Sequence, residues 1–235
     1  LMLLVSLIGT ITHRYSINYL GGNPRQSRFL RLLTLTVVAA FLLMCATNLL
    51  LLFAFWALAS LGLHRLLTIY QDRREAIRPA RKKFVISRLG DAALLSAIYL
   101  IWRDYQTLDL HQFLSAIASN DVGETPTWIA FLIALAAITK SAQFPFHTWL
   151  PETMESPTPV SALMHAGIIN AGGVLLLRFA GLISRVPEVL LMLSIIGTIT
   201  FVIGMVSMWA QVKVKRSLAW STVSQMGFMM VQCGV

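Results

Sequence analysis

The sequence consists largely of apolar runs that are about long enough to cross a lipid bilayer. Windows of about 19 residues locate eight of them, at 1–12, 30–47, 48–70, 84–102, 128–152, 160–183, 188–210 and from 217 onward. A helix of about 20 residues crosses a hydrocarbon core about 30 Å thick, whereas the strands of a membrane barrel alternate in polarity and span about ten residues. We therefore predict an all-α integral membrane protein with about eight transmembrane helices in a single domain over residues 1–235.

The composition supports a lipid environment and argues against nucleic acid. Charged residues make up 12% of the chain, about half the share typical of soluble domains. The net charge of +9 comes from basic residues in short blocks between apolar runs, not from one exposed basic face. We expect the bilayer as the partner and no nucleic acid. Because both ends of the chain lie inside apolar runs, we also expect a fragment of a longer protein.

The basic residues predict how the chain is oriented. If the interval 13–31 faces the cytoplasm, the inner intervals and helix ends hold 14 of the 19 Lys and Arg residues, and the outer ones hold two, Arg103 and Arg185. Lys and Arg accumulate on the cytoplasmic side of membrane proteins. The pattern therefore predicts a multi-pass membrane protein whose basic intervals face the cytoplasm.

Lys140 is the most informative residue of the spans. It lies about 12 residues into the segment 128–152, about 18 Å along a helix and so near the bilayer midplane. Pro145 follows five residues later and cannot continue the helical hydrogen bonds. A broken helix survives in a membrane only inside protein or beside a wet cavity. We predict a helix break near Pro145 with Lys140 on a cation pathway; a simple proline kink with a snorkelling lysine is the alternative.

Two histidines accompany this lysine. His147 lies within the predicted break, and His165 lies about two turns into the next span, 25 residues after Lys140. A neutral imidazole accepts a proton on one nitrogen and donates from the other. Both histidines are therefore candidates for a proton relay, although a membrane histidine can also be a packing residue.

Three further charged residues complete the candidate pathway. Arg88 and Asp91 lie at i, i+3 in the fourth span, close enough for a helical ion pair. Asp91 either anchors Arg88 or influences Lys140. Lys215, in the basic cluster 213–216, is a pathway candidate or an inner anchor. Because the sequence has no phosphate loop, HExxH or paired-cysteine motif, we expect no catalytic centre, metal or cofactor in this chain.

Three motifs resemble a known family of membrane proteins. They are Lys140-Ser-Ala-Gln-Phe-Pro-Phe-His-Thr-Trp-Leu-Pro151 with Ser156-Pro-Thr-Pro-Val-Ser-Ala-Leu-Met-His165, then Arg88-Leu-Gly-Asp91, and Lys215-Arg-Ser-Leu-Ala-Trp-Ser-Thr-Val-Ser-Gln-Met-Gly227. Together they resemble the proton-pumping, antiporter-like subunits of respiratory complex I and of multisubunit cation/proton antiporters. The resemblance implies that the chain holds the third to tenth helices of a longer subunit, namely its first inverted repeat and the start of the second.

Two departures from the family pattern indicate a branch within it. The pumping members carry a glutamate after a tryptophan in the third span, whereas this chain reads Phe55-Trp56-Ala57, and Lys213 replaces an expected aspartate. With the run Ala80-Arg-Lys-Lys-Phe-Val-Ile-Ser-Arg-Leu-Gly-Asp91, the chain is most similar to the DabB membrane subunits of bacterial inorganic carbon uptake systems. That similarity implies a DabA-like partner with carbonic anhydrase-like chemistry, and it places zinc in the partner.

Three functions remain open at this point. The first is a subunit whose flow of protons or sodium ions drives the uptake of CO2 or bicarbonate by the partner. The second is a redox-linked proton pump subunit of complex I or of a related hydrogenase or antiporter complex, against which Ala57 argues. The third is a membrane anchor that conducts nothing, against which Lys140 and His165 argue.

Overall fold

The computed structural model describes residues 2–69, 74–119 and 124–235. Every regular element in these ranges is a helix, and their one strand-like contact is an isolated bridge between Asn48 and Asp109. The longer helices are α1 (Met2–Tyr19), α2 (Gln26–Cys45), α3 (Leu49–Leu67), α4 (Arg74–Tyr105), α5 (Leu110–Ser119), α6 (Glu124–Lys140), α8 (Thr158–Ala166), α9 (Ala171–Arg178), α11 (Pro187–Trp209) and α12 (Val214–Cys233). The short ones are α7 (Trp149–Glu152), α10 (Ala180–Ile183) and the 3-10 turns η1 (Thr153–Glu155) and η2 (Ile168–Asn170).

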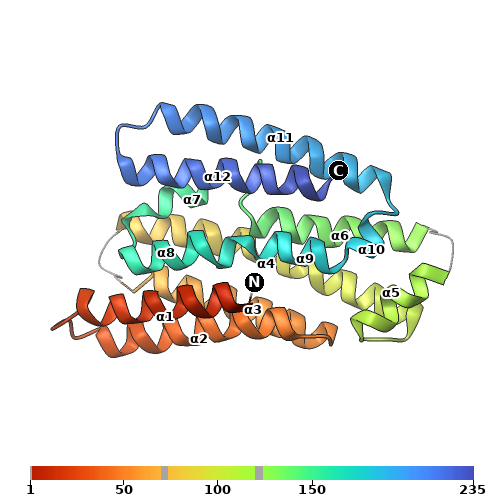
Figure 1. Ribbon diagram of the computed structural model, residues 1–235, viewed down its shortest axis with the longest axis horizontal. Coiled ribbons are helices and arrows are strands. Elements are labelled where there is room, and N and C mark those ends of the chain that lie inside the picture. Colours follow the sequence, from red (N-terminus) through yellow and green to blue (C-terminus); the bar gives the residue numbers. More distant parts are fainter. Residues whose placement is uncertain (1, 70–73, 120–123) are drawn as a thin grey trace.

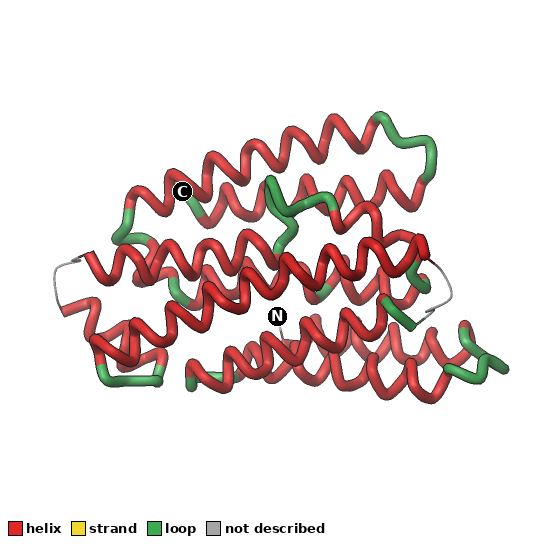
Figure 2. The backbone as a smooth tube through the Cα atoms, turned by 180° about the vertical axis from the view of Figure 1, so that it is seen from behind, coloured by secondary structure: helices red, strands yellow, loops and turns green. Residues whose placement is uncertain are grey.

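The long helices run side by side along one axis in three tiers (Figure 1). The helices α1, α2 and α3 form one side, the pair α11 and α12 forms the other, and α4, α6, α8 and α9 lie between them. Figure 2 shows the same order from behind. The middle tier therefore supplies the groups that are shielded on both sides, and it contains Lys140 at the end of α6.

Each of the eight predicted segments contains helix. Within the described ranges, five helical stretches are long and apolar enough to cross a membrane, and they are 26–45, 49–67, 77–105, 158–178 and 187–209. Thr125–Lys140 is apolar but shorter. These stretches confirm an all-helical chain with several membrane spans, while the full number of eight stays a prediction.

Two polar intervals contain helix that the hydropathy pattern did not predict. The helix α4 begins at Arg74, so residues 74–83, which lie outside the predicted apolar segments, are helical. Arg and Lys favour helix, so the helix continues past the apolar run. The helix α5 lies in the interval between the apolar runs 84–102 and 128–152. At its start, the Asp109 carboxylate accepts hydrogen bonds from the backbone N–H groups of His111 and Gln112.

A second helix interruption lies in the segment 160–183, which we expected to be continuous. The helix α8 ends at Ala166, the turn η2 follows Gly167, and α9 begins at Ala171. Glycine weakens a helix interior because it gains more backbone freedom in the unfolded chain. The break places Gly172 against the end of α6, where a Cβ atom would lie only 2.5 Å from the carbonyl oxygen of Ala137. The two interrupted helices therefore pack closely at their breaks.

Candidate functional site

The helix α6 ends at Lys140, so the interruption expected near Pro145 is present. Ala142 has a left-handed backbone with φ of 50°. The N–H of Gln143 donates to the carbonyl of Ile138 at 3.1 Å, which is the bond that closes a Schellman helix end. Residues 141–148 form turns, and the chain returns to helix at Trp149. Pro145 has no backbone N–H to donate, so the helix cannot continue through this position.

Polar groups in this interruption bond to two other parts of the chain and to each other. The Ser141 hydroxyl donates to the carbonyl of Ile169 in the second interruption at 2.9 Å. The Gln143 side-chain amide donates to the Ser141 carbonyl at 3.0 Å, and the Thr200 hydroxyl of α11 accepts from the N–H of Phe144 at 2.9 Å. These bonds satisfy backbone groups that the break would leave without hydrogen-bond partners. The bond from Ser141 to Ile169 also holds the two interruptions together.

Lys140 is 6% exposed, which confirms the expected burial. Its Nζ atom donates to the Ser60 hydroxyl at 2.5 Å and to the Trp56 carbonyl at 3.3 Å, both on α3. The Nζ atom also lies 4.3 Å from the centre of the Trp56 ring, where the ring face attracts a cation. The helix α3 contains no Asp or Glu, and Ala57 stands at the position of the glutamate that the resemblance suggested. Neutral oxygens and an aromatic face therefore hold this lysine on the α3 side.

Arg88 and Asp91 form the predicted ion pair on α4, with 2.5 Å between Nη2 and Oδ2. Asp91 is 6% exposed and also accepts a hydrogen bond from the Trp56 indole N–H at 3.0 Å. One face of Trp56 thus contacts Lys140 while its N–H binds the carboxylate. Asp91 acts both as an anchor for Arg88 and as a negative charge joined to the lysine through one shared tryptophan.

Lys83 is a member of this cluster that the sequence analysis missed. We counted it with the basic residues of an inner interval, yet it is 3% exposed and its Nζ atom donates to the Ser60 carbonyl at 3.0 Å. Lys83, Ser87 and Asp91 are all buried and follow one another at intervals of four, which is the spacing of one helix face. That spacing was the available signal, and the run of basic residues at 81–83 concealed it.

His165 and Lys215 lie in a separate group near the start of α12. Lys215 donates from Nζ to the Ser156 carbonyl at 3.1 Å, and His165 is half-buried with no partner for its Nδ1 atom among the described residues. The hydrogen bonds of Lys140 lead to α3 and not to His165. The structure therefore brings Lys140, Asp91 and Arg88 together, and a relay from Lys140 to His165 stays a prediction.

His147 lies within the interruption, as expected, and is 8% exposed. Its ring stacks on Phe144 at 5.9 Å and lies 5.7 Å from the ring of Trp220 on α12. Its Nδ1 atom and the Oε1 atom of Gln143 have no hydrogen-bond partner within the described part of the chain. Buried polar atoms without protein partners are commonly satisfied by water. These two atoms are therefore candidates for water-mediated steps near the break.

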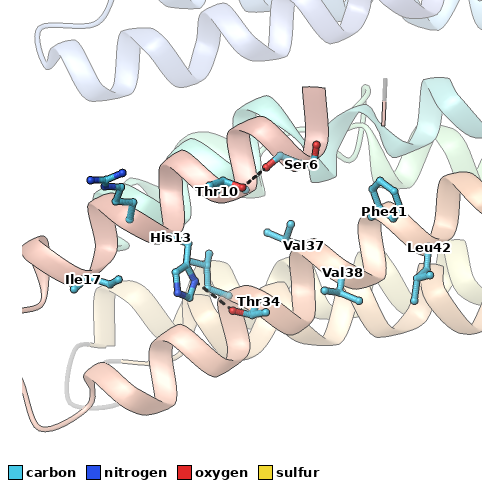
Figure 3. A pocket seen from close by; sticks show the side chains of 12 residues that line it. Ser6, Thr10, His13, Ile17, Thr34, Val37, Val38, Phe41 and Leu42 are labelled. Carbon is cyan, nitrogen blue, oxygen red and sulfur yellow. Dashed lines mark hydrogen bonds between the residues drawn. The ribbon is translucent and has the colours of Figure 1, made fainter. Parts of the chain in front are cut away.

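A groove of about 480 Å³ lies between α1 and α2, and it is distinct from the lysine cluster. Figure 3 shows Val37, Val38 and Phe41 along it, with the hydroxyl of Thr34 near the His13 ring. None of its lining residues belongs to the group around Lys140. The groove is largely apolar.

The cluster around Lys140 has the chemistry of a proton carrier. An amine held by neutral oxygens in a protein interior can exist with or without its proton, because burial disfavours the charged form. The carbonyl and hydroxyl partners accept hydrogen bonds from either form. Within the described residues, no three His, Cys, Asp or Glu side chains are grouped to hold a metal ion.

The chain matches a family model over most of its length. Residues 46–235 match the model described as NADH:quinone oxidoreductase/Mrp antiporter, TM. A solved chain in the Mrp complex from Dietzia sp. DQ12-45-1b is 34% identical and superimposes with a TM-score of 0.92, over 99% of this chain and 26% of that one. This match and the five spans show a multi-pass integral membrane protein.

Curated relatives include the type suggested by the sequence motifs. The probable inorganic carbon transporter subunit DabB2 of Halothiobacillus neapolitanus is 45% identical over 234 residues, which are 99% of this chain and 42% of that protein. The chloroplastic NAD(P)H-quinone oxidoreductase subunit 5 of Lemna minor is 35% identical, over 100% of this chain and 32% of that protein. The expected resemblance to DabB subunits is confirmed. The chain spans less than half the length of these relatives.

Proposed function

The chain belongs to the NADH:quinone oxidoreductase/Mrp antiporter family, and from that premise we propose that it is the proton-translocating membrane subunit of an inorganic carbon uptake complex. The sequence supports this proposal, because the chain is 45% identical to DabB2 and 35% identical to the Lemna minor quinone oxidoreductase subunit. The site also supports it, because Lys140 is buried and lies where α6 is interrupted. By its similarity to the Halothiobacillus neapolitanus subunit we place the protein in a bacterial inner membrane, with its basic intervals on the cytoplasmic side.

The observation that carries the proposal is the environment of Lys140. A buried ammonium in a membrane protein is costly and by default marks a pathway. Here the ammonium lies at an interruption between two helices and is held by the Ser60 hydroxyl and the Trp56 carbonyl. Such partners allow the amine to lose and regain a proton. The proposed carrier is the amine nitrogen of Lys140, which binds a proton, and the ammonium repels a sodium ion, so we favour the proton over sodium.

Proton flow would serve a partner subunit. By its similarity to DabB, the chain would work with a DabA-like subunit that carries zinc, and zinc at such a site activates water for attack on CO2. Proton movement through this chain would make the hydration of CO2 run in one direction. The described residues of this chain would supply the pathway, and the partner would supply the reaction.

Inorganic carbon accumulation in cells tests the proposal. The full-length protein and its partner are expressed together or singly in cells that cannot concentrate CO2. We expect uptake only with both subunits, loss of uptake with a protonophore, and loss with Lys140→Met. Lys82→Met is the matched control, because Lys82 is exposed and pairs with Glu152. Uptake at the wild-type level with Lys140→Met would refute the pathway.

A redox-linked proton pump is the second candidate. Its support is the 35% identity to the Lemna minor quinone oxidoreductase subunit over the whole chain. Ala57 argues against it, since the pumping relatives were expected to place a glutamate there. The purified complex should be indifferent to NADH and quinone under our proposal. Quinone-dependent electron transfer that drives proton movement would favour the redox pump.

A further inference from the structure

Two buried lysines converge on one serine of α3. The Nζ atom of Lys140 donates to the Ser60 hydroxyl at 2.5 Å, and the Nζ atom of Lys83 donates to the carbonyl oxygen of the same residue at 3.0 Å. Their exposed fractions are 6% and 3%. They come from different helices, α6 and α4, so the fold and not the sequence brings the two amines together.

The cluster has more positive than negative groups. Asp91 is the only carboxylate hydrogen-bonded or ion-paired within it among the side chains that the structure describes, and it is paired with Arg88 and bonded to the Trp56 indole. If both lysines kept their protons, two like charges would share a buried site without a carboxylate of their own. Burial and like-charge repulsion both disfavour that state.

We propose that Lys83 is a second residue of the proton pathway, and that Lys83 and Lys140 form a coupled pair that holds one proton across Ser60. This inference rests on the proposed function. In the transfer step, the Lys83 ammonium gives one proton to the neutral Lys140 amine. Lys83 becomes a neutral amine and Lys140 an ammonium, so the charge of the pair is unchanged. Interacting groups of this kind titrate as a pair and not as separate sites.

The position of Lys83 suits an entry point from the inner side. Its sequence neighbour Lys82 is exposed and forms an ion pair with Glu152 at 2.9 Å, which places that turn of α4 at the surface. Lys140 ends α6 at the interruption. The pair thus connects the basic end of α4 with the centre of the bundle. The lysine pair would take the place of the lysine–carboxylate pair expected from the family pattern.

Other titratable groups around Lys83 are few among the described residues. On α3, His64 lies one turn after Ser60, and its ring packs 4.7 Å from that of Phe84. On α4, Arg88 and Asp91 are paired with each other, and α6 contributes Lys140. The Nδ1 atom of His64 has no partner among the described residues, so this ring is a further proton acceptor near the pair. The variant His64→Phe removes this acceptor, so the test can separate the effect of His64 from that of the lysine pair.

Solid-state NMR of ¹⁵N-labelled lysine tests the pair without any transport. The full-length protein is reconstituted in lipid with its partner, and the two Nζ signals are assigned with Lys83→Met and Lys140→Met. We expect one amine and one ammonium in total near neutral pH, and we expect Lys140 to stay protonated to a pH higher by about one unit or more in Lys83→Met. His64→Phe should leave that shift in place. Two ammonium signals near neutral pH, with Lys140 unaffected by Lys83→Met, would overturn the proposal.

Proton flux through liposomes gives the second readout. Lys83→Arg keeps the charge and can keep the bond to Ser60, but a guanidinium does not release its proton. A purely structural role for Lys83 is rescued by Arg, whereas a transfer role is lost, so we expect flux to fall at least about tenfold. Lys82→Met should retain flux. Wild-type flux in Lys83→Arg would overturn the inference. If the wild type conducts no protons but NMR still shows one amine and one ammonium, only the proposed function would be refuted.

Discussion

Gly172→Ala should destabilise the junction between the two helix interruptions. A Cβ atom on Gly172 would lie 2.2 Å from the Ser141 hydroxyl oxygen and 2.5 Å from the Ala137 carbonyl oxygen, where ordinary contact begins at 3.4 Å. The hydroxyl can rotate away only by giving up its bond to the Ile169 carbonyl. The Ala137 oxygen belongs to the backbone of α6 and cannot rotate, so the helices must move apart.

The expected loss combines these contacts. Overpacking a tight contact costs about 1–3 kcal/mol, and losing the hydroxyl bond costs about 1 kcal/mol. Alanine regains up to about 1 kcal/mol of helix propensity. We therefore expect the free energy of unfolding to fall by about 1–3 kcal/mol, measured by thermal or denaturant unfolding of the purified protein in detergent.

A second glycine provides the matched control. A Cβ atom on Gly181 would meet only Leu114 Cδ2, at 3.7 Å, which is an ordinary contact. Gly181→Ala should therefore leave the stability unchanged or raise it slightly. If Gly172→Ala proves as stable as the wild type, the two interruptions are not packed as the structure shows, and the reasoning fails.

Three further substitutions test one ion pair and two sets of hydrogen bonds by the same unfolding measurement. Asp91→Asn removes the charge that pairs with Arg88 while still accepting from the Trp56 indole, so we expect a loss of about 1–3 kcal/mol; an unchanged stability would contradict the ion pair. Arg178→Met should cost about 1.5–3 kcal/mol, because the guanidinium donates to two carbonyls at the end of α2; no loss would show that these carbonyls find other donors. Thr200→Val removes the acceptor for the Phe144 N–H and should cost about 1 kcal/mol, whereas a gain in stability would count against that contact.

The sequence predicted the architecture better than the details of the site. Runs of apolar residues located helix in all eight segments, because the bilayer dictates their length and composition. Proline at 145 located the first interruption, since proline cannot donate the required hydrogen bond. The interruption after Gly167 was missed because glycine within an apolar run is compatible with a continuous helix. The close approach of Gly172 to Ala137 is a tertiary contact that the sequence does not show.

The site shows the same division between local and tertiary information. Arg88 and Asp91 are neighbours on one helix, and their pairing follows from their spacing. Lys83 was assigned to a surface block because its neighbours are basic, and its burial depends on Ser60 from another helix. The partners of Lys140 on α3 likewise depend on how α3 and α6 are placed in the bundle. Apart from the four-residue spacing of Lys83, Ser87 and Asp91, these contacts leave no signal in one sequence.

Proton flux in liposomes tests the central claim most directly. The full-length protein with its partner is reconstituted, a pH gradient is imposed, and its decay is followed with a pH-sensitive dye for the wild type, Lys140→Met and Lys82→Met. The account predicts that the wild type and Lys82→Met dissipate the gradient, and that Lys140→Met is slower by at least about tenfold. Equal decay in all three would contradict a proton pathway through Lys140.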